Sequence, residues 1–179
     1  MKYLHTKLND YIKESYIDNN GNLEDMSQED INEILKGYID CALWTEEERL
    51  KQENDTYSEE DEEDYNDMSE IDKIVSTQSK FNSKSFDSFT SEDIDVNSKI
   101  EAYKDIKKFI QSSGDKAIEE AISENGLDRL GMDIWLTRNR HGAGFFDRGY
   151  KNQDILEKSA LDLGEKYLVI GDDGLLYFE

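Results

Sequence analysis

The chain has 179 residues, enough for one domain with an appendage, and its hydrophobic and charged fractions are both 36%. The net charge of −22 argues against direct binding to nucleic acid, which requires clustered Lys and Arg, and it steers the protein toward basic surfaces. Residues 1–18 lack a signal-peptide pattern, no apolar run reaches a membrane span, and the one cysteine, Cys41, permits no internal disulfide. We therefore expect a protein of the reducing cytoplasm.

Two helices are predicted at the start of the chain. The first covers residues 3–17, where apolar residues recur at helical spacing before an Asn- and Gly-rich stop. Ser27 followed by Asp30 predicts the cap of the second helix. Its apolar stripe consists of Ile31, Ile34, Leu35, Tyr38, Ile39, Ala42 and Leu43.

Residues 46–72 differ in character from this helix. They hold fourteen acidic residues against Arg49 and Lys51, a net charge of −12 out of −22. One interpretation is a solvated, disordered loop, because blocks of like charge usually are disordered. The alternative, suggested by Tyr57, Tyr65 and the apolar residues near Ile74, is an acidic helix with one side that packs on the body or on a partner.

The next stretch predicts two more helices. Thr90 and Asp93 offer a helix start, followed by an amphipathic stripe that ends near Gly114. Asp115 is expected to cap a second helix that Gly126 closes.

Residues 131–150, GMDIWLTRNRHGAGFFDRGY, have the strongest pattern in the chain. Met132, Ile134 and Leu136 alternate with Asp133, Trp135 and Thr137, which predicts a strand. A glycine-rich turn over 138–144 and a returning strand at Phe145 and Phe146 would complete a hairpin. Trp135, Phe145 and Phe146 are then expected in the core, although such a hairpin could instead display a binding or catalytic loop.

The C-terminal part predicts a helix over 154–163 and a strand over 167–170. Gly171-Asp172-Asp173-Gly174 has the residues of a hairpin turn, after which residues 175–178 return. The predicted class is α+β: N-terminal amphipathic helices followed by a small antiparallel sheet with one crossing helix. We expect a helical part over 1–50, an acidic segment over 51–89, and a part over 90–179 that packs with 1–50 as one domain.

The stretch 131–150 resembles a family of small bacteriophage proteins with the pattern G-H-D-F-W-L-T-R-N-x-H-G-A-G-F-W-D-R-G and a G-D-D-G hairpin near the C-terminus. Here Met132 replaces the usual histidine and Phe146 the usual tryptophan. Residues 38–44, YIDCALW, are similar to the family's Y-I-x-x-A-L-W. Relative to this pattern, residues 51–84 are an insertion. The resemblance implies a phage or prophage origin and no particular chemistry.

Reactive side chains are sparse. The only histidines are His5 and His141, and His141 lies in the glycine-rich stretch where it could be a general base or a metal ligand. Carboxylate partners would have to come from Asp133, Asp147, Asp172 or Asp173. Zinc-ligand spacings, a P-loop and a dinucleotide pattern are missing from the sequence, so we expect no catalytic residue, metal or cofactor.

The one basic cluster consists of Arg138, Arg140 and Arg148. Residues 131–179 hold nine acidic and six basic residues, a net charge of −3. Most of the negative charge therefore lies in the rest of the chain. We expect the arginines to pair with Asp133, Asp147 or neighbouring carboxylates. With His141 they are also a secondary candidate for an interaction surface.

Two functions remain open. The first is a phage-encoded inhibitor that is not an enzyme and acts as a DNA mimic, occupying the basic channel of a host defence enzyme such as a restriction enzyme or a Cas9–guide RNA complex (an anti-restriction or anti-CRISPR role). The second is a metal-dependent hydrolase or nucleic-acid-processing enzyme that uses the His141 loop. The expected partner-binding residues in the first case are Glu59, Glu60, Asp61, Glu62, Glu63, Asp64, Asp67, Glu70 and Asp72.

Overall fold

The computed structural model describes residues 26–67, 89–171 and 173–179, and within 48–67 it describes the backbone only. The helix predicted over 3–17 lies outside the described residues. In the described part, five α-helices and two 3₁₀ turns accompany one two-stranded antiparallel sheet, so the α+β class is confirmed. None of the helices in these ranges has the length and apolar character needed to cross a bilayer.

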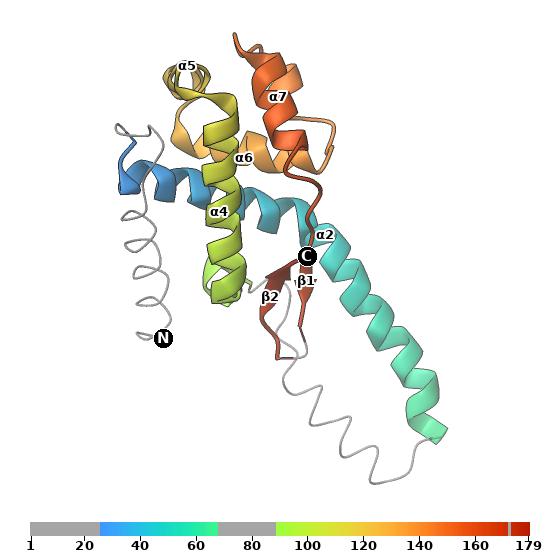
Figure 1. Cartoon of the computed structure of the whole chain (residues 1–179). Coiled ribbons are helices and arrows are strands. Elements are labelled where there is room, and N and C mark those ends of the chain that lie inside the picture. The colour runs from blue at the N-terminus through green and yellow to red at the C-terminus, as the bar shows by residue number, and fades with distance from the viewer. Residues whose placement is uncertain (1–25, 68–88, 172) are drawn as a thin grey trace.

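Helix α2 (Gln28–Asp67) is the longest element and supports the others. It begins with the predicted cap: Asp30 N donates to Ser27 Oγ over 3.1 Å and Ser27 N donates to Asp30 Oδ2 over 3.0 Å. Its first half buries the predicted apolar stripe from Ile31 to Ala42. Its second half continues without interruption through the acidic residues and leaves the body of the molecule (Figure 1).

Helix α6 (Leu127–Arg138) packs on the first half of α2, and two glycines bring the helices together. A Cβ atom on Gly37 would lie 2.0 Å from the carbonyl oxygen of Asp128. A Cβ atom on Gly131 would lie 2.0 Å from the carbonyl oxygen of Ile34. Only hydrogen fits at these two points, so the two backbones touch.

Helix α4 (Val96–Ser113) runs across α2, and α5 (Asp115–Asn125) follows it (Figure 1). The predicted start at Thr90 corresponds to a short 3₁₀ turn, η2 (Ser91–Asp93), which Thr90 caps. The α-helix starts later, because the Asp95 carboxylate accepts hydrogen bonds from Asn97 N and Ser98 N. α5 is closed by Gly126, as predicted. Its N-terminal cap position is Gly114 without a side-chain cap, so Asp115, which was predicted to cap it, is instead its first helical residue.

The hairpin predicted over 132–146 is wrong. Residues 132–136 belong to α6, and Phe145 and Phe146 lie in the 3₁₀ turn η3 (Phe145–Asp147). Every residue from Asp133 to Arg138 is buried, because α2, α5, α7 and η3 all pack around this helix. A helix buried on all sides shows no 3.6-residue period, and the remaining alternation resembled a strand.

The C-terminal elements follow the prediction closely. Helix α7 (Gln153–Leu161) precedes a hairpin of β1 (Leu168–Ile170) and β2 (Leu176–Phe178), in which Val169 pairs with Tyr177. Because the first predicted hairpin is absent, α7 leads into this sheet and does not connect two of its strands. A parallel bridge from Ile94 to Leu176 fixes the hairpin against the segment before α4.

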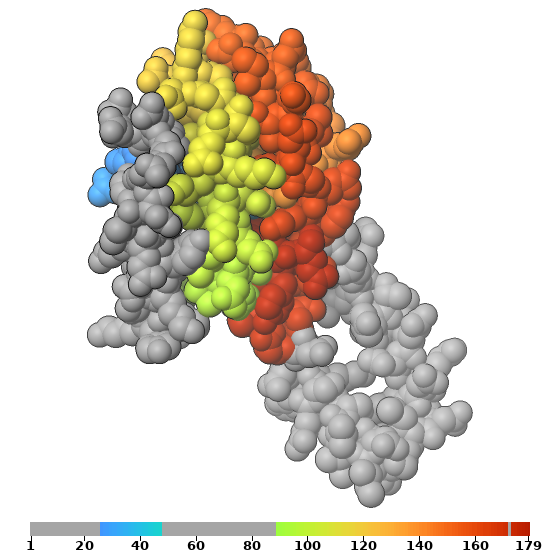
Figure 2. Space-filling model, viewed as in Figure 1, coloured from blue at the N-terminus to red at the C-terminus, as the bar shows by residue number. Residues whose placement is uncertain are grey.

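One aromatic core joins these elements. The Trp135 ring stands edge-on to Tyr38 at a centroid distance of 5.1 Å, and Phe145 stacks on Phe109 at 5.6 Å. Trp135 and Phe145 are fully buried, as predicted, whereas Phe146 is 42% exposed and does not belong to the core. Figure 2 shows α4 lying alongside the C-terminal segments on one continuous face.

Candidate functional site

Arg138 occupies the centre of the domain and not its surface. Its side chain is 1% exposed, and Nη1 donates to Tyr38 Oη over 2.6 Å and to Asp105 Oδ2 over 2.9 Å. Nε and Nη2 donate to the carbonyl oxygens of Gly164 and Leu163 over 2.7 and 3.3 Å. The guanidinium therefore ties α6 to α2, to α4 and to the segment after α7, and it has no face left for a partner.

Asp133 is the second buried charge of α6. Tyr150 Oη donates to its Oδ2 over 2.8 Å, and Arg148 Nε lies 3.4 Å from its Oδ1. Burial raises the pKa of Asp133, and the Tyr150 hydrogen bond and the Arg148 charge oppose that rise. Burial and the adjacent carboxylate raise the pKa of Tyr150. Because Arg148 also lies 3.7 Å from Asp147, the predicted pairing of this arginine with Asp133 and Asp147 is confirmed.

The glycine-rich segment after α6 folds back on the helix through Thr137. Phe145 N donates to Thr137 Oγ1 over 3.0 Å, and Gly144 N donates to Asp147 Oδ1 over 2.9 Å. Gly144 has a φ of 135°, and a Cβ atom there would lie 2.2 Å from Thr137 Oγ1. Much of the 131–150 stretch therefore serves to form and close this turn, which is a structural role.

Of the secondary candidate surface, Arg140 is the most exposed residue, and the side chains of His141 and Arg148 are partly exposed. Arg140 Nε lies 3.5 Å from a Glu165 carboxylate oxygen, with both side chains largely exposed. His141 Nε2 lies 3.9 Å from Oε1 of Glu46, a residue of α2 that is itself buried. Asp173 instead accepts hydrogen bonds from Tyr177 Oη and Leu175 N in the hairpin turn, and Asp172 lies outside the described residues.

Within the described ranges, no group of three or more His, Cys, Asp or Glu side chains is arranged to hold a metal ion. The carboxylates proposed as partners of His141 have other contacts, namely Asp133 with Tyr150 and Asp147 with Gly144. Among the described residues, the carboxylate that lies beside His141 is that of Glu46 on α2, which the sequence did not indicate.

Seven of the nine expected partner-binding residues, Glu59 to Asp64 and Asp67, lie on the backbone of α2. Glu70 and Asp72 lie outside the described residues. Residues 59–64 place six acidic residues on consecutive helical positions, or one formal charge per about 1.5 Å of helix axis. Duplex DNA carries one charge per about 1.7 Å of its axis.

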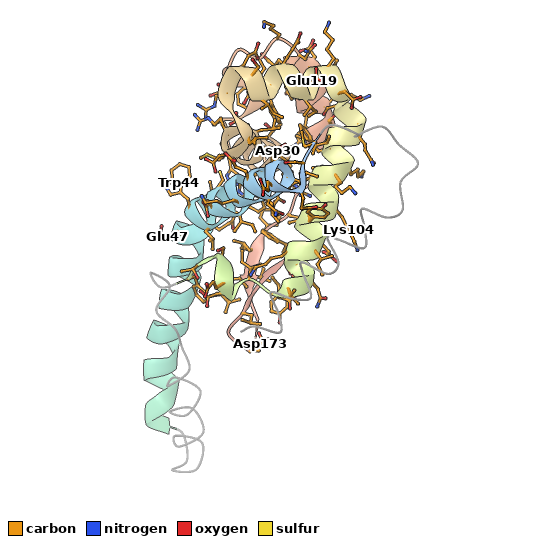
Figure 3. All side chains as sticks on the ribbon, turned by 90° about the vertical axis from the view of Figure 1, so that its left-hand side faces the viewer. Asp30, Trp44, Glu47, Lys104, Glu119 and Asp173 are labelled. Carbon is orange, nitrogen blue, oxygen red and sulfur yellow. The ribbon has the colours of Figure 1, made fainter. Side chains whose placement is uncertain are left out.

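Sequence reasoning missed Trp44, which is 67% exposed. The residue lies off the apolar stripe of α2 and shares a face with Asp40, four residues earlier, and Glu47, three residues later. Figure 3 shows the Trp44 and Glu47 side chains projecting from the same side of the helix. The helical spacing was a sufficient signal, because the core-facing side of α2 continues through Cys41, Ala42 and Thr45, and position 44 lies off that side.

The chain was compared with protein-family models, curated proteins and solved structures, and no match was found in any of the three comparisons.

Proposed function

We propose that this protein is a phage-encoded, acidic inhibitor that binds the basic nucleic-acid channel of a host defence enzyme and acts as a DNA mimic. The observation that carries the proposal is the continuity of α2 from the buried core through residues 59–64. On a helix, those six acidic residues have a charge spacing close to that of a DNA duplex.

The charge distribution supports the same function. Residues 46–72 contribute −12 of the net −22, and residues 131–179 contribute only −3. A channel lined with Lys and Arg attracts such a segment over long range and raises the association rate. Restriction enzymes and Cas9–guide RNA complexes have channels of this kind, which makes anti-restriction and anti-CRISPR activity the two specific forms of the proposal. The resemblance to phage proteins in residues 131–150 agrees with such a role.

The test measures binding to a Cas9–guide RNA complex and to a panel of restriction endonucleases, together with inhibition of DNA cleavage. We expect association with the target to slow steeply as salt rises, because exposed charges are screened beyond roughly 8–10 Å at physiological ionic strength. A neutralised variant replaces six acidic residues with their amides and should associate much more slowly. Its substitutions are Glu59→Gln, Glu60→Gln, Asp61→Asn, Glu62→Gln, Glu63→Gln and Asp64→Asn.

A distal control variant removes the same number of charges from exposed positions elsewhere and leaves the same net charge. Its substitutions are Glu29→Gln, Glu33→Gln, Glu92→Gln, Glu119→Gln, Asp154→Asn and Asp162→Asn. The proposal requires the neutralised variant to lose far more association rate than the distal control. Equal losses of association rate in the two variants would show that only the net charge matters. An association rate that changes neither with salt nor in either variant would refute the DNA-mimic proposal.

A further inference from the structure

Trp44 is the most exposed of the large hydrophobic side chains in the described part of the chain. It is 67% exposed, and the next in order, Ile155 on α7, is 46% exposed. An indole on a helix surface leaves a large apolar area in water, and tryptophan is among the residues that dominate binding energy at protein interfaces.

The outward direction of Trp44 is set by its neighbours on α2. Cys41 and Ala42 are buried, and Thr45 Oγ1 accepts a hydrogen bond of 2.8 Å from Trp135 Nε1 in the core. These contacts fix the rotation of the helix about its axis. Position 44 consequently faces away from the body just before the helix enters its acidic half.

The chemistry around the indole is acidic. Asp40 and Glu47 lie one helical turn before and after Trp44 on the same face. Asp40 also accepts from Lys36 Nζ over 2.6 Å, in an exposed ion pair within the same helix. An aromatic ring beside acidic side chains suits a guanidinium, which stacks on the ring in a region of negative charge.

We propose that Trp44, with Asp40 and Glu47, is an anchor for arginine side chains on the surface of a basic protein partner. The inference rests on the proposed function and names its contact site. Nucleic acid and anionic membrane surfaces are unsuitable occupants, because the net charge of −22 repels both.

The two parts of α2 then have different tasks. The acidic run over 59–64 raises the association rate, since long-range attraction acts before contact. The Trp44 anchor lowers the dissociation rate, since aromatic stacking requires contact. Loss of the anchor should therefore leave the salt dependence of association unchanged.

The probe is a nona-arginine peptide, with nona-citrulline as an uncharged analogue of similar shape. Titrations follow tryptophan emission, in which exposed Trp44 responds and buried Trp135 serves as background, together with calorimetry. We expect Trp44→Ala to weaken nona-arginine binding roughly tenfold, the equivalent of one well-packed aromatic contact. Trp44→Phe should retain most of the affinity, and Trp44→Leu, which keeps the apolar surface without the ring, should not. Nona-citrulline should bind far more weakly than nona-arginine.

The matched control is Ile155→Ala, which removes an exposed apolar side chain on α7 and should leave binding unchanged. A melting curve for each variant verifies folding. If the neutralised variant loses affinity while Trp44→Ala does not, the anchor is refuted and the acidic inhibitor stands. If neither variant loses affinity, both proposals fail. Full affinity of Trp44→Leu would refute the arginine-stacking chemistry, and tight binding of a DNA duplex would refute the choice of partner.

Discussion

Arg138 Nη1 on α6 donates a hydrogen bond of 2.6 Å to the hydroxyl oxygen of Tyr38 on α2, a residue 100 positions earlier in the chain. Both side chains are buried, and the same nitrogen reaches Asp105 on α4. One guanidinium thus joins three helices at the buried first half of α2.

Arg138→Lys should destabilise the protein although it preserves the charge. An ammonium group cannot satisfy the Tyr38 hydroxyl, the Asp105 carboxylate and the two carbonyl oxygens at once. Breaking a buried charge network typically costs about 3–5 kcal/mol, and urea unfolding would measure the loss. Arg140→Lys, at a largely exposed ion pair, is the control and should change the unfolding free energy by less than about 0.5 kcal/mol. Equal stability of the two variants would contradict the role given to Arg138.

Gly131→Ala should also be destabilising, although alanine has a higher helix propensity than glycine. In an open helix this change gains about 1 kcal/mol, but here the new Cβ would lie 2.0 Å from Ile34 O and 2.7 Å from Tyr38 N. α2 and α6 would have to separate, at a cost of about 1–3 kcal/mol or more. Thermal unfolding tests the sign, with Gln111→Ala on the exposed face of α4 as the control. A raised melting temperature for Gly131→Ala would show that the helices do not touch as described.

Cys41 should resist thiol reagents in the folded protein. Burial, followed by the nearby Asp133 charge, raises the pKa of its thiol from 9.0 to about 12. The reactive thiolate is therefore scarce at about pH 8 and should remain so until the pH approaches the raised value. Labelling with a chromogenic disulfide should be slow in buffer and fast in urea. Rapid labelling of the native protein would mean that this part of α2 opens readily.

The acidic half of α2 should gain helicity when its charge is neutralised. Glu59 and Glu63, and likewise Glu60 and Asp64, are like charges four residues apart, which costs about 0.2–0.5 kcal/mol per pair. The last turn also has no basic residue to complement the helix dipole. Far-ultraviolet circular dichroism should show more helix in the neutralised variant, and added salt should do the same for the natural chain. A similar gain in the distal control variant would contradict this explanation.

Several features followed from the sequence because they depend on residues close together in the chain. The Ser27–Asp30 cap, the glycine that ends α5 and the C-terminal hairpin each involve a few neighbouring positions, so local chemistry predicted them. The concentration of charge in residues 46–72 and the pairing of Arg148 with acidic neighbours were also evident from composition and spacing.

The tertiary structure decided the rest. Residues 132–136 are helical because α6 is enclosed by other elements, and enclosure removes the amphipathic period that would have revealed a helix. Phe145 is buried and Phe146 exposed because a 3₁₀ turn closed by Thr137 and Asp147 directs adjacent side chains differently. Arg138 is buried and links three helices because Tyr38 and Asp105, which are distant from it in sequence, hydrogen-bond to it in the folded chain. Local sequence patterns do not reveal such long-range contacts.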